Sequence, residues 1–218
     1  MYDELKAFTL ASGPTEFGVS NIEDLRPHFD ALPMDQTEGL SYAISIGGSV
    51  SSAVLKGCII GPTRHYLHNY RMVNWMLDQT AAKLTGIIQN KGFNAMPIPA
   101  SQIVDWEKQT AHMSHKMAAI RSGLGWIGRN NLLVSPKYGS KIRLATLLTD
   151  MPLEADKPVE QDCGACKKCI DVCPVSAIND SHKDWNKPAC LEKLKYFAKA
   201  HNVGQYICGL CVKVCNPY

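Results

Sequence analysis

Four closely spaced cysteines followed by a proline constrain this chain more than any other feature. The run reads Cys163-Gly-Ala-Cys166-Lys-Lys-Cys169-Ile-Asp-Val-Cys173-Pro174. In this pattern three closely looped thiolates cover one cubane iron–sulfur cluster, and the cysteine before the proline points toward a second cluster. The thiols that a second site needs are also present: Cys190, Cys208, Cys211 and Cys215. The cysteines therefore predict two sites with four thiolates each.

The crossed arrangement of two-cluster ferredoxins assigns these thiols to two [4Fe-4S] centres. One centre takes Cys163, Cys166, Cys169 and Cys215, and the other takes Cys173, Cys190, Cys208 and Cys211. Two zinc sites are a less favoured alternative, because all-cysteine zinc sites are usually built from separated Cys-x-x-Cys pairs. A disulfide framework is less favoured still, since the N-terminus does not resemble a signal peptide and the thiols lie too close in sequence to pair among themselves.

The length and net charge of the chain limit the classes of protein to which it can belong. The 218 residues suffice for one domain of about 150 residues and a small module, and no apolar run approaches the roughly 20 residues that span a bilayer. We therefore expect a cytoplasmic protein without a membrane partner. The net charge of +3 is too slight to indicate a nucleic-acid partner. Residues 163–218 carry eight lysines against four acidic residues, which favours compensation of the cluster charge over recruitment of an acidic electron donor.

The periodicity of apolar residues predicts alternating helices and strands before the cysteines. The expected helices span residues 2–12, a short segment capped by Asn21, residues 62–89 and residues 104–121. The expected strands span residues 16–19, 40–46 and 93–98, with a turn at 47–49 after the second and a hairpin formed by 132–135 and 141–149. The fold class is therefore α+β: an α/β domain at 1–150 with a mixed sheet and flanking helices, a linker at 151–162, and a ferredoxin-like module at 163–218.

A cysteine and two histidines that precede the cysteine run could have either structural or chemical roles. Cys58 lies far along the chain from the other cysteines, in an apolar run, and we interpret it as a buried structural thiol. His65 and His68 on the long helix are interpreted as surface or hydrogen-bonded histidines more readily than as ligands.

Three glycines surround a tryptophan in Gly123-Leu124-Gly125-Trp126-Ile127-Gly128. The spacing matches a dinucleotide motif, but it follows a predicted helix where that motif requires a strand. Two interpretations stay open. The loop is either a tight structural turn or a backbone that lies close against a large flat ligand, with the indole beside it.

The order of these features resembles the epoxyqueuosine reductase family, which is related to the reductive dehalogenases. The resemblance rests on the glycine loop at 123–128, the hairpin ending in Leu147-Leu-Thr-Asp150-Met-Pro152, the first cysteine run, the lone Cys190 and the second run. It covers residues from about 105 to the C-terminus, and residues 1–100 match only in layout.

The resemblance implies that the front domain binds cobalamin or another corrinoid whose flat ring faces a [4Fe-4S] cluster. Electrons would pass from a low-potential donor of the flavodoxin or ferredoxin type through the two clusters to cobalt(I). The cofactor would supply the chemistry and the protein the position and protons. The residues expected along the corrin are Gly123, Leu124, Gly125, Trp126, Ile127 and Gly128, and more loosely Tyr66 and Tyr70.

Two departures from the family pattern bear on function. The family continues into a helical domain that helps to grip tRNA, whereas here Cys215 is followed by three residues, and we expect a short form for which a tRNA substrate is doubtful. The family also carries a proton-donating aspartate before the glycine loop. Gln109 stands at that place, and glutamine delivers no proton. Asp105, His112 and His115 are nearby candidates, of which a histidine is the better acid near neutral pH.

Three hypotheses follow from the sequence. The first is a cobalamin and iron–sulfur dependent oxidoreductase acting on a small electrophile or a modified nucleoside. The second is a protein that transfers electrons to a corrinoid, or to a corrinoid-protein partner, without substrate turnover of its own. The third is a two-cluster ferredoxin fused to an unrelated fold, which the glycine loop disfavours.

Overall fold

The computed structural model describes residues 1–29 and 31–216, and the chain divides into two compact units. The first unit consists of Met1–Gly48, Asn74–Leu124 and Arg143–Val159. The second consists of Ser49–Val73, Gly125–Ile142 and Glu160–Tyr218. Both units are therefore assembled from segments distant in sequence. Residues 217–218, at the end of the expected cluster module, lie outside the described residues.

A four-stranded sheet forms the centre of the first unit, in the order β1-β2-β6-β3. These strands span Glu16–Asn21 (β1), Tyr42–Ser49 (β2), Ala95–Ile98 (β3) and Ile142–Thr149 (β6). β1 is antiparallel to β2, and β3 is antiparallel to β6. The two long strands, β2 and β6, are buried along nearly their whole length, in keeping with their near-continuous apolar sequences.

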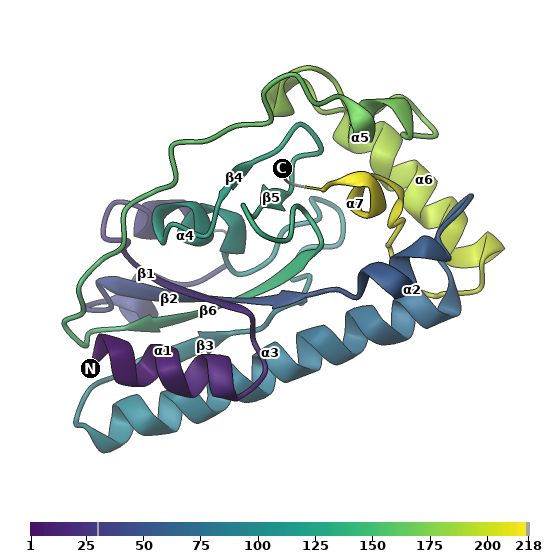
Figure 1. The fold of residues 1–218 in the computed structure, drawn as a ribbon. Coiled ribbons are helices and arrows are strands. Elements are labelled where there is room, and N and C mark those ends of the chain that lie inside the picture. Colours follow the sequence, from purple (N-terminus) through teal and green to yellow (C-terminus); the bar gives the residue numbers. More distant parts are fainter. Residues whose placement is uncertain (30, 217–218) are drawn as a thin grey trace. The chain divides into compact units, whose positions relative to one another are not determined.

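Helices cover both faces of this sheet (Figure 1). α1 (Tyr2–Ala11) and the later turns of α3 (Arg64–Asn90) lie on one face, and α4 (His115–Arg121) lies on the other. The ring of Tyr2 meets that of Phe17 edge to face, with 5.4 Å between centroids. The apolar face of α3 is buried as its three-to-four periodicity predicts, through Val73, Leu77, Ala81, Leu84 and Ile88.

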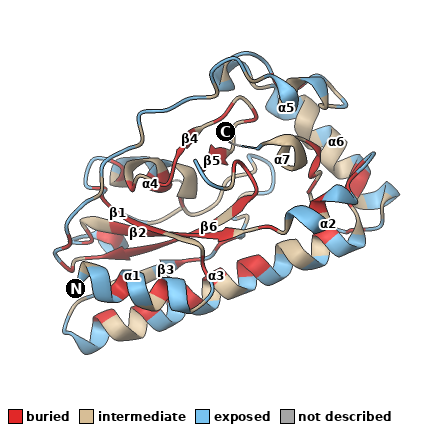
Figure 2. Ribbon diagram, in the orientation of Figure 1, coloured by how far each residue is buried: buried red, intermediate tan, exposed pale blue. Residues whose placement is uncertain are grey.

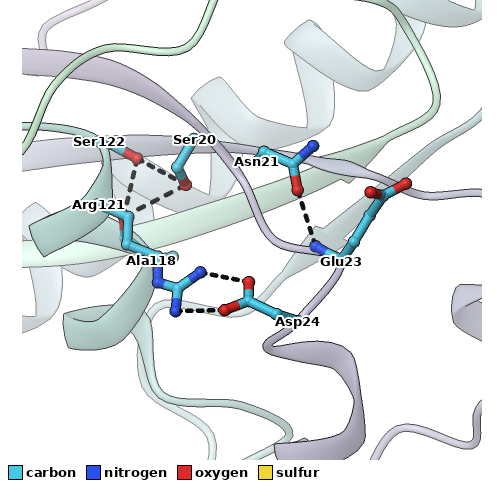
Figure 3. Close-up of polar contacts among 7 residues, drawn as sticks. All are labelled: Ser20, Asn21, Glu23, Asp24, Ala118, Arg121 and Ser122. Carbon is cyan, nitrogen blue, oxygen red and sulfur yellow. Dashed lines mark hydrogen bonds and ion pairs between the residues drawn. The ribbon is translucent and has the colours of Figure 1, made fainter.

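Polar contacts fasten the end of α4 to β1 and to the segment that follows β1 (Figure 3). The hydroxyl of Ser122 donates to the carbonyl of Ala118 at 2.8 Å and lies 3.2 Å from the hydroxyl of Ser20. The guanidinium of Arg121 forms a two-pronged ion pair with Asp24. The buried hydroxyls are thus hydrogen-bonded, which removes the cost of burying them.

The second unit contains short helices and a small two-stranded sheet. Its elements are α2 (Ser52–Lys56), the first turns of α3, β4 (Trp126–Ile127), β5 (Leu133–Val134), α5 (Lys168–Asp171), α6 (Lys187–Ala200) and α7 (Leu210–Val214). Side chains cap the N-termini of α2 and α6. The Ser51 hydroxyl accepts from the N–H of Val54, and the Asn186 amide oxygen accepts from the N–H of Ala189. The buried cluster of this unit comprises Val50, Leu55, Cys58, Tyr66, Val203 and Ile207. In Figure 2 the strands β1 and β2 of the first unit are drawn largely in red, as buried.

The expected elements are largely confirmed, with four corrections. Gly47 and Gly48 continue β2 instead of forming a turn, because residues 16 and 47 pair across the strands. In place of the helix expected after Asn21, the described residues form the 3-10 turn η1 (Arg26–His28), in which Pro27 has no N–H for a longer helix. Two further 3-10 turns, η2 (Asp35–Thr37) and η3 (His182–Asp184), were not expected.

The third and fourth corrections concern residues 104–149. The predicted helix 104–121 is wrong over its first part, since α4 begins only at His115 and residues 105 and 110 form an isolated β-bridge. The predicted hairpin is also wrong, because β5 pairs with β4 while β6 joins the large sheet. The α+β class stands. None of the helices among the described residues is long and apolar enough to cross a membrane.

Candidate metal centres

The first expected group of thiols comes together in the second unit. Burial raises the pKa of the Cys169 thiol to about 11, and the nearby thiols of Cys215, Cys163 and Cys166 add to the shift. Cys169 lies on α5, whereas Cys215 directly follows α7. The three cysteines with which Cys169 was grouped from the sequence therefore lie near it, but so does Cys211 of the other group, and the grouping stays a prediction.

The members of the second expected group also lie near one another in this unit. Burial raises the pKa of the Cys211 thiol far above its usual range, with Cys208 and Cys190 as the next causes. Burial likewise raises the pKa of Cys208 to about 11, and Cys190, Cys173 and Cys58 contribute. Cys58 is thus distant from this group along the chain but close to it in space.

This donor chemistry fits iron–sulfur clusters. Several buried thiols that disfavour one another's ionisation need a nearby cation to become thiolates, which bound iron supplies. Among residues 1–29 and 31–216, no group of three or more His, Cys, Asp or Glu side chains has the geometry of a site for a metal ion. A cubane cluster is wider than a single ion, so the four thiolates that bind it lie farther apart than the ligands of one metal ion.

N–H groups donate to sulfurs of both cysteine groups. The indole Nε1 of Trp126 lies 3.5 Å from Sγ of Cys163. The backbone N–H of Ser140 donates to Sγ of Cys215 at 3.2 Å. At the second group, the backbone N–H of Ala177 donates to Sγ of Cys173 at 3.2 Å. Hydrogen bonds to cluster sulfurs stabilise the more negative, reduced form.

A guanidinium holds the loop that carries the first two cysteines. Arg129 donates to the carbonyl of Cys166 at 3.0 Å and to that of Gly164 at 2.8 Å. Its Nε also lies 3.9 Å from a carboxylate oxygen of Asp180. An open hollow of about 180 Å³ adjoins this site, lined by Ile127, Arg129, Asp162, Cys163, Gly164, Asp180, Ser181 and His182.

The glycines of the loop at 123–128 are required by the protein's own packing. A Cβ on Gly125 would lie 2.0 Å from the carbonyl oxygen of Val134, across the β4–β5 pair. A Cβ on Gly128 would lie 2.5 Å from Cγ2 of Val134 and 3.5 Å from the Cys163 sulfur. The tight-turn interpretation therefore accounts for these glycines, and a corrin contact at residues 123–128 stays a prediction.

The two tyrosines that were expected near a corrin differ in their surroundings. Tyr66 is 4% exposed in the buried cluster of the second unit, and its ring lies so close to Gly209 that a Cβ there would come within 3.0 Å. Tyr70 meets the Tyr66 ring edge to face at 6.3 Å and is half-buried. Cys58 is fully buried in the same cluster, as predicted.

Asp105, a candidate proton donor, and Gln109, at the place of the family's acid, lie in a turn of the first unit. The Asp105 carboxylate accepts the backbone N–H groups of Glu107 and Lys108 at 2.9 Å, and the bond from Lys108 is the first cause that holds the pKa of Asp105 below its usual range. An ionised carboxylate has no proton to give. The Gln109 amide donates to the carbonyl of Trp106.

The two histidines of this region are more informative. His115 lies 2.9 Å through Nε2 from the carbonyl of Pro99, so Nε2 carries the proton, and Nδ1 then accepts from the hydroxyl of Thr146 at 2.8 Å. Burial lowers the pKa of His115 to about 4. His112 has Nε2 3.1 Å from the Gln102 side chain, while its Nδ1 is buried without a hydrogen-bond partner. His112 therefore has one ring nitrogen left for a bound group.

Comparison with protein families decides the nature of the cysteine module. The model of the "4Fe-4S double cluster binding domain" matches residues 162–217. This part of the chain is a double [4Fe-4S] cluster domain. The zinc and disulfide alternatives for its cysteines are thereby set aside.

Curated relatives confirm the resemblance that was drawn from the sequence. The epoxyqueuosine reductase of Listeria monocytogenes is 36% identical over 118 residues, which cover 50% of this chain and 30% of that protein. The epoxyqueuosine reductase of Leadbetterella byssophila is 35% identical over 115 residues, covering 49% of this chain and 37% of that protein. The matched part thus spans only about a third of these relatives.

Solved structures share the fold over nearly the whole chain. A catabolic reductive dehalogenase in complex with 3-bromo-4-hydroxybenzoic acid superposes with a TM-score of 0.77 at 18% identity, covering 97% of this chain and 31% of that one. An epoxyqueuosine reductase with an epoxyqueuosine-modified tRNA stem loop superposes with a TM-score of 0.65 at 20% identity, covering 98% and 64%. The double [4Fe-4S] cluster domain therefore sits within an α+β fold that both classes of enzyme use.

Sequence reasoning did not find Arg129 or the backbone N–H of Ser140. A lone arginine and a main-chain donor carry no spacing pattern. The position of Arg129 directly after Gly128 was the one available signal.

Proposed function

We propose that this chain is the redox core of a cobalamin-dependent iron–sulfur reductase that acts on a small electrophile or a modified nucleoside. The supporting observation is the match to the double [4Fe-4S] cluster domain, within a fold shared with epoxyqueuosine reductases and a reductive dehalogenase. In this proposal residues 1–150 supply most of the cofactor pocket, 151–162 the linker, and 163–218 the clusters. Cobalamin, when bound, would supply a strongly reducing and nucleophilic cobalt(I).

The chain's own residues divide the remaining tasks. Cys163, Cys166, Cys169 and Cys215 hold one cluster, and Cys173, Cys190, Cys208 and Cys211 hold the other. Trp126 and Ser140 donate hydrogen bonds to the first group and make that cluster easier to reduce. The two clusters thereby form a relay that delivers single electrons.

His112 is the group that we propose for proton delivery. Its Nδ1 is buried and has no partner among the described residues. A buried nitrogen of this kind is costly unless a bound group completes its hydrogen bond. This orphaned nitrogen fits a cofactor or substrate in the first unit. Asp105 and His115 are weaker candidates, because the first is ionised in a turn and the second has both ring nitrogens engaged.

Anaerobic reconstitution tests the proposal in two steps. The protein is first assayed for iron, for which two clusters predict about eight atoms per chain, and then titrated with cobalamin while the visible spectrum is recorded. Turnover is measured with epoxyqueuosine, both free and in a tRNA stem loop. Cluster-loaded protein that takes up no cobalamin would refute the proposal.

A second candidate function is electron transfer to a corrinoid held by a partner protein. The observation that favours it is Gln109 at the place of the family's acid, with its amide turned to a neighbouring carbonyl. If cobalamin binds but epoxyqueuosine is not reduced, rapid reduction of a corrinoid protein would support this candidate. A gain of turnover in Gln109→Asp would instead show that a missing acid limits the pocket.

A further inference from the structure

Two neighbouring isoleucines of the second unit are turned to solvent. Ile59 and Ile60 are 76% and 77% exposed, in the loop between α2 and α3. We call residues 57–63 the Ile59–Ile60 loop. Single exposed apolar residues are ordinary, but an adjacent pair of β-branched side chains on a short loop forms a compact apolar tip.

This loop is held against the helices that carry the second group of cysteines. The Lys213 ammonium, on α7, donates to the carbonyl of Cys58 at 2.8 Å. His201, at the end of α6, donates through Nδ1 to the carbonyl of Pro62 at 3.0 Å. A Cβ on Gly61 would come within 2.7 Å of the rings of Phe197 and His201. The loop is therefore fixed against the helices of Cys190 and Cys211 through Cys58, Gly61 and Pro62, while its apolar tip faces solvent.

The segments around this loop are strongly basic. Residues 49–73 contain Lys56, Arg64 and Arg71 and no acidic residue, and residues 187–216 contain five lysines and one glutamate. Residues 160–186, which hold the first cysteine run, contain three lysines and five acidic residues. The segments around the loop thus carry an excess of positive charge, whereas residues 160–186 carry an excess of negative charge.

We propose that the Ile59–Ile60 loop and its basic surroundings dock an acidic protein electron carrier, which reduces the cluster of Cys173, Cys190, Cys208 and Cys211. In each encounter one electron leaves the carrier's reduced centre and enters this cluster, and no bond is made or broken. This inference rests on the proposed function, because both require the two clusters. The new element is the surface at which electrons enter.

The chemistry of the surface favours this partner over others. A small apolar centre within a charged rim is the usual anatomy of transient protein interfaces, and complementary charge raises the rate of encounter. A single-stranded nucleic acid would need aromatic side chains on which its bases stack, and isoleucines provide none. A protein with carboxylates around its redox centre matches both the apolar tip and the basic rim.

Stopped-flow reduction of the cluster-loaded protein tests the inference, with flavodoxin hydroquinone as the carrier and dithionite as a small reductant. Reversal of the rim charge in the Lys56→Glu/Arg64→Glu variant should slow reduction by the carrier about tenfold or more at low salt, and Ile59→Ser/Ile60→Ser should slow it at every salt concentration. Lys183→Glu, an exposed lysine in the 160–186 segment, is the matched control and should leave the rate unchanged. Reduction by dithionite should be the same in all four proteins.

The possible failures are distinguishable. Loss of the clusters themselves, seen as missing iron, would overturn both the proposed function and this inference. Intact clusters that flavodoxin reduces equally fast in the wild type and both surface variants would overturn the docking site alone. Slowing by Lys183→Glu but not by Lys56→Glu/Arg64→Glu would overturn it too, and would move electron entry to the first cluster. Tight binding of single-stranded RNA, lost in the same variants, would identify the surface as a nucleic-acid site and contradict the carrier.

Discussion

At the scale of single residues, Trp126 links β4 to a cluster ligand through its indole N–H. Trp126→Phe keeps the ring and removes the donor, so the potential of that cluster should fall. A net hydrogen-bond free energy of roughly 0.5–1.5 kcal/mol corresponds to about 20–65 mV for a one-electron couple. A redox titration followed by electron paramagnetic resonance measures the shift. Trp75→Phe, at an exposed indole on α3, is the control, and an unchanged potential in Trp126→Phe would contradict the prediction.

His115 makes the first unit sensitive to acid. Its pKa is lowered from 6.5 to about 4, first of all by burial, so the folded state binds fewer protons than the unfolded state between these pH values. The stability that neutral His115 contributes is complete above about pH 6.5 and is lost as the pH falls toward 4, by on the order of 3 kcal/mol. Hydrogen–deuterium exchange of α4 and β6 should report this loss.

His115→Gln should remove most of that pH dependence, because glutamine does not titrate. His68→Gln, at an exposed position of α3, should retain it. Equal acid sensitivity of wild type and His115→Gln would show that other groups control the opening of α4 and β6.

At the scale of elements, the β4–β5 hairpin depends on a glycine at its closest approach. A Cβ at residue 125 would meet the Val134 carbonyl, and its φ of 152° adds strain for any side chain. Gly125→Ala should therefore destabilise the protein by more than about 2 kcal/mol and speed loss of the first cluster. Thermal unfolding and the decay of visible absorbance measure the two effects.

Gly86→Ala is the matched control. Gly86 lies within α3, and a Cβ there meets no atom within 4 Å. The same change of residue should stabilise the protein by about 0.5–1 kcal/mol. A stable Gly125→Ala variant would show that the hairpin tolerates a wider separation.

The elements that the sequence predicted well are those with local signals. α3 carries a sustained three-to-four apolar repeat, and β2 and β6 carry long β-forming runs, so all three were placed within a few residues. The helix predicted at 104–121 failed because residues 100–114 form bends and turns that local periodicity does not reveal. The hairpin failed because β6 pairs with strands far away in sequence, which no local pattern encodes.

In the candidate site too, the features with a local sequence signal were predicted and those that depend on tertiary packing were not. Cysteine spacing predicted the cluster module, because adjacent ligands of a cluster are close in sequence. The donors around the clusters come from segment 125–142 and depend on tertiary packing, so Arg129 and Ser140 were not predicted. The tryptophan was noticed for its ring, whereas the structure shows its N–H directed at Cys163.

At the scale of the whole molecule, the crossed cysteine groups predict a particular loss of metal. Cys190→Ser removes one ligand of the second group, so the variant should keep the first cluster intact while the second becomes labile, with iron falling from about eight atoms per chain toward about four. Iron analysis and paramagnetic resonance of the reduced protein measure the outcome. Cys58→Ala should retain full iron, although Cys58 lies near Cys208.

The alternative grouping gives a different result. If consecutive cysteines shared a cluster, Cys215→Ser would damage the same centre as Cys190→Ser. In the crossed arrangement the two variants lose different centres, with different resonance spectra. Identical spectra would refute the grouping.

The electrostatic interaction of Cys169 with the distant Cys215 also bears on how the protein is made. On a ribosome, Cys163, Cys166 and Cys169 emerge long before their fourth partner, and Cys173 and Cys190 must likewise wait for Cys208 and Cys211. Neither centre is complete until the last of these thiols has left the exit tunnel. In the crossed grouping, a nascent chain that has not yet reached Cys211 therefore holds incomplete sets of thiols, which cannot close around either cluster.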